Sequence, residues 1–383
     1  MFNYLYSMLF SEIPGQVFVK EKLIQMVLQN RLSHALLFLG KEGSGALQLA
    51  TALAQYITCE QKQQDACGKC PSCKKAAALM HPDIHYSFPT ITRTGLDKPV
   101  CNDFIEEWRQ FNISSPYGNV FDWLQSLEAD NKQGNITAHE CEDIIRKLNL
   151  KSFESGYKIL IQWMPEYLGA SGNKLLKLIE EPPEKTLFLL VAEDESKILP
   201  TILSRTQLVK INHVDSNDIQ HWLIEKQQVP LDKAAAIAPL AQGNLREAMH
   251  LLHHGDENWQ DLLRDWLNAI LKNGPVSQVK WVDEISKLGR EKQKQFIAYF
   301  IHLLSISVYI SNNELPNNVA LDEIDFAQRL TKLASTPQIQ AMVEELDKSI
   351  YYIERNANPK MLFMALSIKF YHIIKDKMVI LVN

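Results

Sequence analysis

Residues 35–57 read ALLFLGKEGSGALQLATALAQYI, and this stretch decides the fold. Ala35–Leu39 is a short, continuous apolar run, which is typical of a strand buried on both faces. A glycine-rich turn follows it, and Ala46–Ile57 then repeats apolar residues at helical spacing. A strand, a tight turn and a helix in this order predict one βα unit of a mostly parallel sheet.

The same alternation of apolar runs and helix-like segments continues over the first 212 residues. Four further runs are predicted as strands: Asp83–Phe88, Tyr157–Ile161, Leu187–Ala192 and Leu208–Ile211. A helix is predicted at Asn173–Glu181, where Pro182 and Pro183 forbid its continuation. This rhythm is typical of a sheet that helices cover on both faces.

From about residue 213 the strand signal disappears. His213–His253 predicts three short helices, and the chain from Asp256 onward predicts a bundle of five or six helices. Trp259, Leu263 and Trp266 recur at the spacing of one buried helical face. The predicted fold class is therefore α/β plus all-α, with domains at residues 1–212, 213–254 and 255–383.

Composition excludes several classes of protein. The 383 residues carry 40 Lys and Arg against 45 Asp and Glu, a net charge of −5, with 46% apolar and 22% charged residues. These ordinary values exclude global disorder, a small stapled scaffold and a uniformly basic nucleic-acid binder. The sequence shows no uninterrupted apolar run of roughly 18–20 residues, and its first ten residues lack the basic flank of a secretory signal. A soluble, cytoplasmic protein without membrane partners is expected.

The turn GKEGSGAL, residues 40–47, stands where a phosphate-binding loop would stand. A working loop of the form GxxxxGK[ST] uses backbone N–H groups, a lysine and a metal-binding hydroxyl. Ala46 and Leu47 replace the lysine and the hydroxyl residue, and Lys41 leaves from the other end of the turn. The glycines that remain are Gly40, Gly43 and Gly45. The sequence favours a tight connection without a ligand, and a backbone cradle for phosphate or sulfate is the alternative.

A second deficit lies after the run Tyr157–Ile161. An ATPase of this topology places carboxylates there to hold Mg²⁺ and polarise water, but this chain has Gln162, Trp163, Met164 and Pro165. Neither tryptophan nor methionine can do this chemistry. No productive binding of ATP and Mg²⁺, and hence no intrinsic ATPase activity, is expected.

Four of the six cysteines share the window CEQKQQDACGKCPSC, with the spacing C-x7-C-x2-C-x2-C. They are Cys59, Cys67, Cys70 and Cys73. Four thiolates in so short a loop suit tetrahedral Zn²⁺, and a closed four-sulfur shell leaves no position for a catalytic water. A structural zinc site is predicted; free thiols, disulfides or an iron–sulfur cluster are the alternatives.

Residues 92–134 fit neither pattern. Aromatic side chains crowd this stretch, which carries seven acidic and four basic residues between Arg93 and Asn135. Its aromatic content predicts an ordered insertion with short helices, and its acidity argues against a nucleic-acid-binding arm.

Several motifs together resemble one family over nearly the whole chain apart from the insertion. They are FSEIPGQ (residues 10–16), SHALLFLG (33–40), the cysteine window, LLKLIEEPP (175–183), ILSR (202–205), GNLREA (243–248) and NANP (356–359). In this order they are similar to the bacterial clamp-loader subunits of the AAA+ family. Within that family the tau/gamma subunits keep a working phosphate loop, whereas this chain resembles a member that does not.

The resemblance implies an AAA+ sheet domain with a zinc module at about 59–73, a small helical lid and a helical collar. It further implies a non-catalytic place in a five-subunit ring with tau/gamma and delta subunits, as part of the replicative DNA polymerase III. That assembly uses ATP to load the sliding clamp onto primer-template DNA. Arg205 matches the family's arginine finger, which acts on the ATP site of the neighbouring subunit. Arg246 matches the second sensor of the lid, for which a salt bridge between lid and core is the other interpretation.

Two other functions remain open on the sequence. The chain could be an independent nucleotide-dependent remodelling ATPase in which Lys41 replaces the absent lysine, which ATP binding by the isolated chain would reveal. It could also be a zinc-containing DNA-binding adaptor, whose affinity for DNA would depend steeply on salt.

Overall fold

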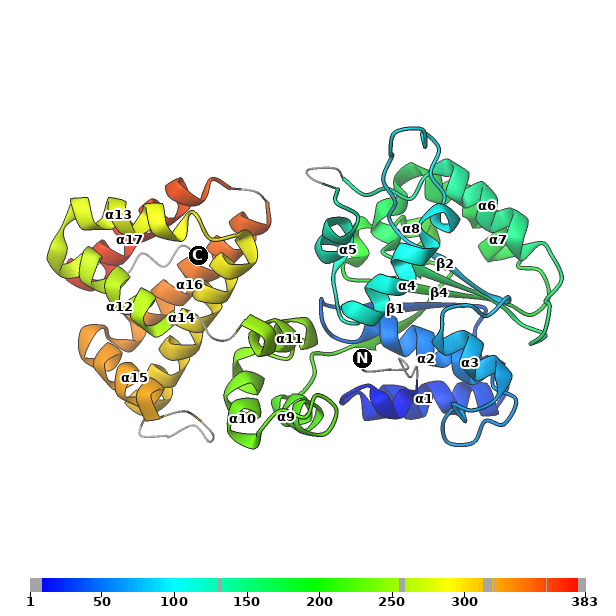
Figure 1. The fold of residues 1–383 in the computed structure, drawn as a ribbon, viewed down its shortest axis with the longest axis horizontal. Coiled ribbons are helices and arrows are strands. Elements are labelled where there is room, and N and C mark those ends of the chain that lie inside the picture. Colours follow the sequence, from blue (N-terminus) through cyan, green and yellow to red (C-terminus); the bar gives the residue numbers. More distant parts are fainter. Residues whose placement is uncertain are drawn as a thin grey trace. The chain divides into compact units, whose positions relative to one another are not determined.

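The computed structural model describes residues 9–129, 133–254, 259–312, 319, 321–355 and 357–377. The chain divides into two compact units, drawn with their elements labelled in Figure 1. One unit comprises residues 1–229 with 241–251, and the other comprises residues 230–240 with 252–383. The three predicted lid helices are thus shared between the units, and the division into three domains stays a prediction.

The first unit contains a five-stranded sheet in the order β2-β3-β4-β1-β5, and every neighbouring pair is parallel. The strands are β1 (Ala35–Gly40), β2 (Ile84–Ser87), β3 (Lys158–Trp163), β4 (Thr186–Ala192) and β5 (Gln207–Ile211). All five lie within one or two residues of the predicted runs. The predicted α/β class with a parallel sheet is confirmed.

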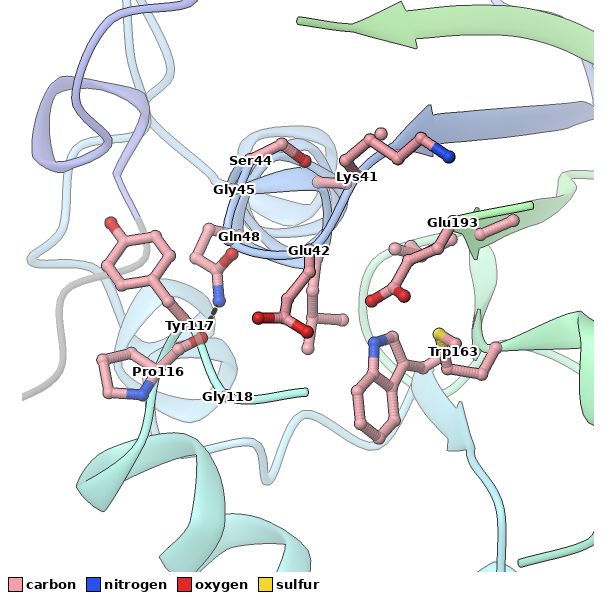
Figure 2. A pocket seen from close by; sticks show the side chains of 17 residues that line it. Lys41, Glu42, Ser44, Gly45, Gln48, Pro116, Tyr117, Gly118, Trp163 and Glu193 are labelled. Atoms are coloured by element: carbon pink, nitrogen blue, oxygen red, sulfur yellow. Dashed lines mark hydrogen bonds between the residues drawn. The ribbon is translucent and has the colours of Figure 1, made fainter. Parts of the chain in front are cut away.

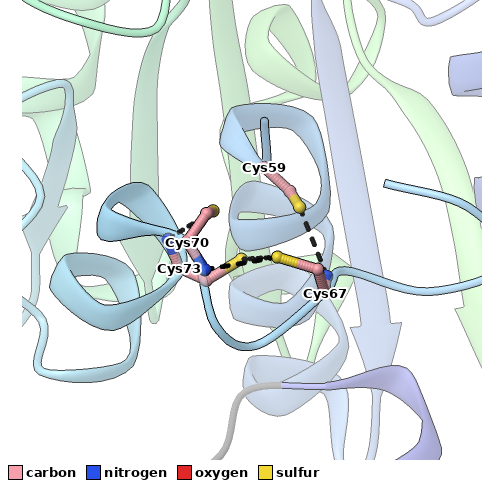
Figure 3. A group of neighbouring side chains, drawn as sticks. All are labelled: Cys59, Cys67, Cys70 and Cys73. Atoms are coloured by element: carbon pink, nitrogen blue, oxygen red, sulfur yellow. Dashed lines mark hydrogen bonds between the residues drawn. The ribbon is translucent and has the colours of Figure 1, made fainter. Parts of the chain in front are cut away.

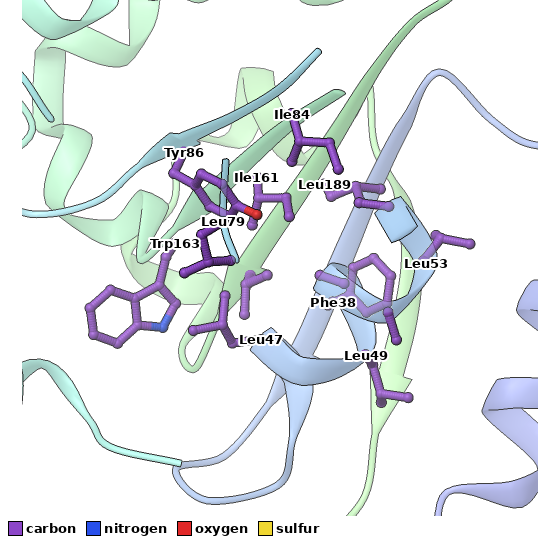
Figure 4. Close-up of a cluster of buried hydrophobic side chains, with 14 of the residues drawn as sticks. Phe38, Leu47, Leu49, Leu53, Leu79, Ile84, Tyr86, Ile161, Trp163 and Leu189 are labelled. Carbon is purple, nitrogen blue, oxygen red and sulfur yellow. The ribbon is translucent and has the colours of Figure 1, made fainter. Parts of the chain in front are cut away.

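Helices cover both faces of this sheet. Those of the first unit are α1 (Val17–Leu28), α2 (Ala46–Thr58), α3 (Pro71–Ala77), α4 (Ile105–Ser114), α5 (Val120–Ser126), α6 (Ala138–Leu148), α7 (Leu176–Glu180), α8 (Pro200–Leu203), α9 (Ser216–Glu225) and α11 (Leu245–His254). Because strand side chains alternate, Leu36 and Phe38 pack on the side of α2, whereas Ala35 and Leu37 pack on the side of α6 to α8. Figure 4 shows Leu49 and Leu53 of α2 in the first of these two cores.

The helix predicted at Asn173–Glu181 is only partly correct. A 3₁₀ segment, η3 (Pro165–Leu175), covers its first residues, and the α-helical part is α7. Gly169, at φ +48°, breaks η3 into two pieces. The α-helical part therefore begins at residue 176, three residues later than predicted.

The insertion is ordered in its described part, as predicted. A 3₁₀ turn, η2 (Cys101–Phe104), leads into α4, and α5 follows. Five buried rings join it to the sheet in one cluster, with centroids of neighbouring rings 4.3–6.1 Å apart: Phe88, Trp108, Phe111, Trp123 and Trp163. Residues 130–132 of the predicted insertion lie outside the described residues.

The second unit is helical throughout its described residues, as predicted. Its helices are α10 (Leu231–Leu240), α12 (Trp259–Asn268), α13 (Pro275–Ile285), α14 (Arg290–Ser311), α15 (Leu321–Leu333), α16 (Thr336–Glu354) and α17 (Pro359–Lys375), and a π-helical turn, η5 (Ala269–Asn273), continues α12. Trp266 lies at the centre of its core, stacked on Trp281 at 4.7 Å. The indole N–H of Trp266 donates to Ser367 Oγ at 2.8 Å, so this buried polar atom is satisfied.

One helical stretch in the described part of the chain, Lys292–Ser311 of α14, is long and apolar enough to cross a membrane by length and composition alone. Half of that stretch is buried inside the protein. Its apolar residues pack against α15 and α16 in the core of the second unit, which accounts for its composition.

Candidate functional site

The phosphate-like loop leaves the carboxyl end of β1 and enters α2 through two glycines with positive φ, Gly43 at +68° and Gly45 at +85°. A Cβ atom on Gly43 would lie 1.8 Å from Asn244 Oδ1. The backbone N–H of Leu245 donates to the Gly43 carbonyl at 2.9 Å. Gly43 is thus required both by its φ angle and by the close approach of the residues that begin α11.

The pocket beside this loop is small, about 30 Å³. That volume accommodates one or two water molecules, whereas pockets for small molecules are roughly ten times larger or more. The loop contributes residues 40–48 to its wall; the rest are Pro116, Tyr117, Gly118, Trp163, Met164, Val191, Ala192 and Glu193 (Figure 2). Gln48 of α2 donates a side-chain hydrogen bond to the Pro116 carbonyl, which ties the insertion to the pocket.

Buried apolar side chains occupy the two places that matter for nucleotide chemistry, the end of the loop and the end of β3. Ala46 and Leu47 are both buried in the core, and Leu47 lies between α2 and the sheet (Figure 4). Trp163, at the end of β3, lies 5.1 Å from Trp108 and 6.1 Å from Phe111 between ring centroids. The side chains at these positions are therefore apolar, whereas binding of a nucleotide with its metal would need a cation and a metal-binding oxygen there.

One acidic residue of the pocket wall, Glu193, was not found by sequence reasoning. Glu193 follows β4 and points into the pocket (Figure 2). Burial, with the nearby carboxylates of Glu42 and Glu166, raises the pKa of Glu193 to about 8. Glu166 Oε1 accepts the backbone N–H groups of Glu193 at 2.7 Å and Asp194 at 2.9 Å. The position of Glu193 directly after a buried strand was the signal that could have revealed it.

Arg246 of α11 is turned inward and is only 3% exposed. Its Nη2 and Nε donate to the two carboxylate oxygens of Asp122 at 2.7 and 2.5 Å, and its Nη1 donates to Glu42 Oε1 at 3.2 Å. Of the two roles considered for Arg246, the structure shows the salt bridge. Its partners are one residue of the loop and one of the insertion.

The four cysteines meet in one place (Figure 3). All four Sγ atoms lie within 4.8 Å of one another, and three of the side chains are buried. Sulfurs bound to zinc at about 2.3 Å in a tetrahedron are roughly 3.8 Å apart, so the group fits such an ion. The described residues thus contain a four-cysteine group able to hold a metal.

Backbone N–H groups point at these sulfurs. Cys59 Sγ accepts from Gln61 at 3.4 Å and from Cys67 at 3.3 Å, and Cys67 Sγ accepts from Cys70 at 3.3 Å. The N–H groups of Lys69 and Cys70 lower the pKa of the Cys67 thiol to about 6. Burial raises the pKa of Cys59. Such N–H donors stabilise thiolates, which are the form that binds a metal.

Arg205 lies at the amino-terminal edge of the sheet, just before β5, whereas the loop lies at the carboxyl-terminal edge, just after β1. β5 pairs in parallel with β1, with Gln207 opposite Leu36 and Ile211 opposite Gly40. The loop follows Gly40 at the carboxyl edge, whereas Arg205 precedes Gln207 at the amino edge. Strands rise about 3.3 Å per residue, so the two edges are roughly 13–16 Å apart. Arg205 therefore cannot reach a phosphate held by the loop of its own chain.

The Arg205 side chain is 32% exposed and is held by neighbours in its own unit. Its Nε donates to Glu180 Oε1 at 2.7 Å, and its Nη2 contacts the same oxygen. Its Nη1 donates to the Thr201 carbonyl at 2.8 Å and to Ser204 Oγ at 3.1 Å. These hydrogen bonds fix the orientation of the guanidinium at the surface of the unit.

A parallel five-stranded sheet with a glycine-rich loop after β1, a helix start packed on that loop and a four-cysteine group define the class, a unit of the type found in clamp-loader subunits. Residues 15–215, more than half of the chain, match the family described as DNA polymerase III, delta subunit. The chain belongs to that family.

Individual relatives agree with this membership. The chain is 24% identical over 322 residues to DNA polymerase III subunit delta' of Yersinia pestis, covering 82% of this chain and 81% of that protein. It is 25% identical over 311 residues to subunit delta' of Escherichia coli K12, covering 78% and 79%. It is 24% identical to subunit tau of Bacillus subtilis 168 over 94% of this chain, although it spans only 61% of that protein's length. The resemblance to the delta-prime subunit of the bacterial DNA polymerase III clamp loader is confirmed.

Among solved structures, a gamma subunit-related protein of DNA polymerase III from Thermotoga maritima covers 91% of this chain and 98% of its own. The sequence identity is 15% and the TM-score is 0.39.

Proposed function

We propose that the chain is a non-catalytic clamp-loader subunit of the replicative DNA polymerase III that supports ATP-driven loading of the sliding clamp onto primed DNA. Family membership supports a role in replication. The observation that carries the non-catalytic role is the pocket of about 30 Å³, which is walled by Ala46, Leu47 and Trp163 instead of nucleotide-binding groups.

Energy for the assembly must then come from other subunits. The partners we propose are tau/gamma and delta subunits, bound through the helical second unit and the faces of the sheet unit, with the clamp and primer-template DNA reached through the assembled complex. We propose Zn²⁺ as the ion held by Cys59, Cys67, Cys70 and Cys73. Bound there, zinc would supply folding energy by joining the end of α2 to α3.

Arg205 is the group that this chain would lend to a neighbour. A guanidinium is planar and permanently charged, so it can contact two oxygens of a transferring phosphoryl group. Its place at the amino edge of the sheet, away from its own loop, supports action on a site in another subunit. An arginine supplied in this way accelerates phosphoryl transfer by roughly 10³- to 10⁵-fold in GTPases.

The test is reconstitution of the complete clamp loader with this chain carrying Arg205→Ala. DNA-stimulated ATP hydrolysis by the assembled complex should fall, with the loss confined to the adjacent site, while the complex still assembles. Arg31→Ala, which removes another exposed arginine of the same unit, should leave hydrolysis unchanged. Full ATPase activity with Arg205→Ala would refute the role of Arg205, and ATP turnover by the isolated wild-type chain would refute the non-catalytic assignment.

A further inference from the structure

Three segments that are distant in the sequence meet at the phosphate-like loop. They are the loop itself, residues 116–122 of the insertion and the start of α11. Asn119 Nδ2 donates to Glu42 Oε2 at 2.6 Å, which joins the insertion to the loop. Asn244 Nδ2 donates to Glu42 Oε1 at 3.2 Å, which joins α11 to the loop. Glu42 is therefore a shared acceptor for both neighbours.

Charge explains why these segments stay together. Arg246 is buried, and a buried cation is stable only when an anion of suitable geometry is close. Asp122 presents both carboxylate oxygens to Nε and Nη2, a bidentate pair, and Glu42 approaches Nη1 from the loop. The hydrogen bonds and charge of Arg246 outweigh burial and lower the pKa of Asp122, so this carboxylate is ionised at neutral pH. The negative charge beside the loop is thus supplied by the chain's own side chains.

Asp122 is itself fixed in place by the insertion. Asn119 and Asp122 form a reciprocal capping box at the start of α5, with hydrogen bonds of 3.0 and 3.1 Å between side chain and backbone. The ring of Tyr117 meets Trp222 of α9 edge-on at 5.5 Å, which gives the insertion a second contact with the helices that follow the sheet. Trp108 and Trp123 anchor the other side of the insertion in the core.

We propose that the insertion is an internal ligand of the phosphate-like loop. Asp122, together with Glu42, takes the place of an anionic ligand for Arg246, and residues 116–118 occupy the space beside the loop. These contacts hold the start of α11 on the loop without any nucleotide.

Hydrogen exchange of the full-length chain tests this proposal. Peptides covering residues 40–47 and 245–249 report the opening of α11 from the loop, and peptides of β3 and β4 report the sheet. In the wild type, millimolar MgATP should leave exchange in both reporter segments unchanged. Asp122→Asn, which keeps the size of the side chain and removes its charge, should raise their exchange roughly 10- to 100-fold, because Arg246 loses its main buried partner.

Glu106→Gln is the matched control, because it removes one charge from an exposed residue of the same insertion. Exchange in the two reporter segments of Glu106→Gln should equal that of the wild type. Glu42→Gln should also raise exchange in the two reporter segments. If Asp122→Asn raises exchange in β3 and β4 as well, the result of Glu42→Gln decides the outcome. Wild-type exchange in the reporter segments of both Asp122→Asn and Glu42→Gln would overturn the proposal. Increased protection of the wild type by MgATP would overturn it as well.

Discussion

The two edges of the central sheet have opposite characters. At the carboxyl edge the insertion and α11 pack on the loop after β1, and the pocket there has a volume of about 30 Å³. At the amino edge Arg205 stands at the surface, oriented by Glu180. Parallel sheets usually place their chemistry at the carboxyl edge. Here the insertion and α11 pack at that edge, and a surface arginine paired with Glu180 lies at the other. The contrast shows that the two ends of one sheet can be packed very differently within a single fold.

The largest expected effect concerns the cysteine centre, which begins at Cys59, directly after α2. Cys70→Ser removes one of four ligands, and in small zinc domains the metal supplies roughly 10 kcal/mol of folding free energy. We expect one zinc per wild-type chain by elemental analysis. Loss of the ion from the variant should markedly lower the unfolding free energy of the sheet unit, measured in urea.

Cys141→Ser is a suitable control, since Cys141 is buried on the other face of the sheet and belongs to no group of four. A metal-free wild-type chain of unchanged stability would contradict the assignment of zinc.

A smaller effect on stability is expected from removing an aromatic ring that holds the insertion to the sheet. Trp108 is 1% exposed and lies at the centre of the ring cluster that joins the insertion to Trp163. Trp108→Ala should destabilise the sheet unit by about 3–5 kcal/mol, because it leaves a large cavity. Urea unfolding followed by circular dichroism measures this loss.

Phe121, which belongs to the same insertion but is 42% exposed, gives the comparison. Phe121→Ala should change stability by less than about 1 kcal/mol. Equal effects of the two substitutions would show that the ring cluster does not hold the insertion to the sheet.

The smallest effect is a pH dependence at the carboxyl edge. In the folded chain Glu193 keeps its proton up to about pH 8, whereas its ordinary pKa is 4.5. Between these values the folded state binds more protons than the unfolded state, so the unfolding free energy falls as pH rises. In Glu193→Gln the unfolding free energy should decrease by about 1–4 kcal/mol less between pH 5 and pH 8 than in the wild type. Urea unfolding at several pH values in this range measures the difference.

Glu195, an exposed acidic neighbour, provides the control substitution Glu195→Gln. An unchanged slope of stability against pH in Glu193→Gln would show that this carboxyl group titrates normally.

Much of the architecture could be predicted because it is written in local patterns. Strands β1 and β4 are continuous apolar runs, since a strand covered on both faces buries both sets of alternating side chains. The cysteine group could be predicted because its ligands lie within 15 residues of one another. The replacement of lysine and hydroxyl by Ala46 and Leu47 was readable for the same reason. The helix predicted at Asn173–Glu181 is only partly correct, because its first three residues belong to the 3₁₀ segment η3.

What the sequence could not show was which distant residues would meet. Arg246 is separated by 124 residues from Asp122 and by 204 from Glu42, and no periodicity connects them. Glu193 was overlooked because its unusual pKa depends on burial and on Glu42 and Glu166, which only folding brings close.

By itself, the sequence determined the order of strands and helices, the four-cysteine window and the loss of the residues that handle nucleotide. These depend on short-range spacing and on side-chain chemistry, which each segment carries with it. The tertiary structure alone decided that the insertion lines the pocket, that Arg246 pairs with Asp122 and Glu42, and that Arg205 stands at the edge opposite the loop. Strand register and the packing of remote segments fix those relationships, because burial of charge and of aromatic surface is a property of the whole folded unit.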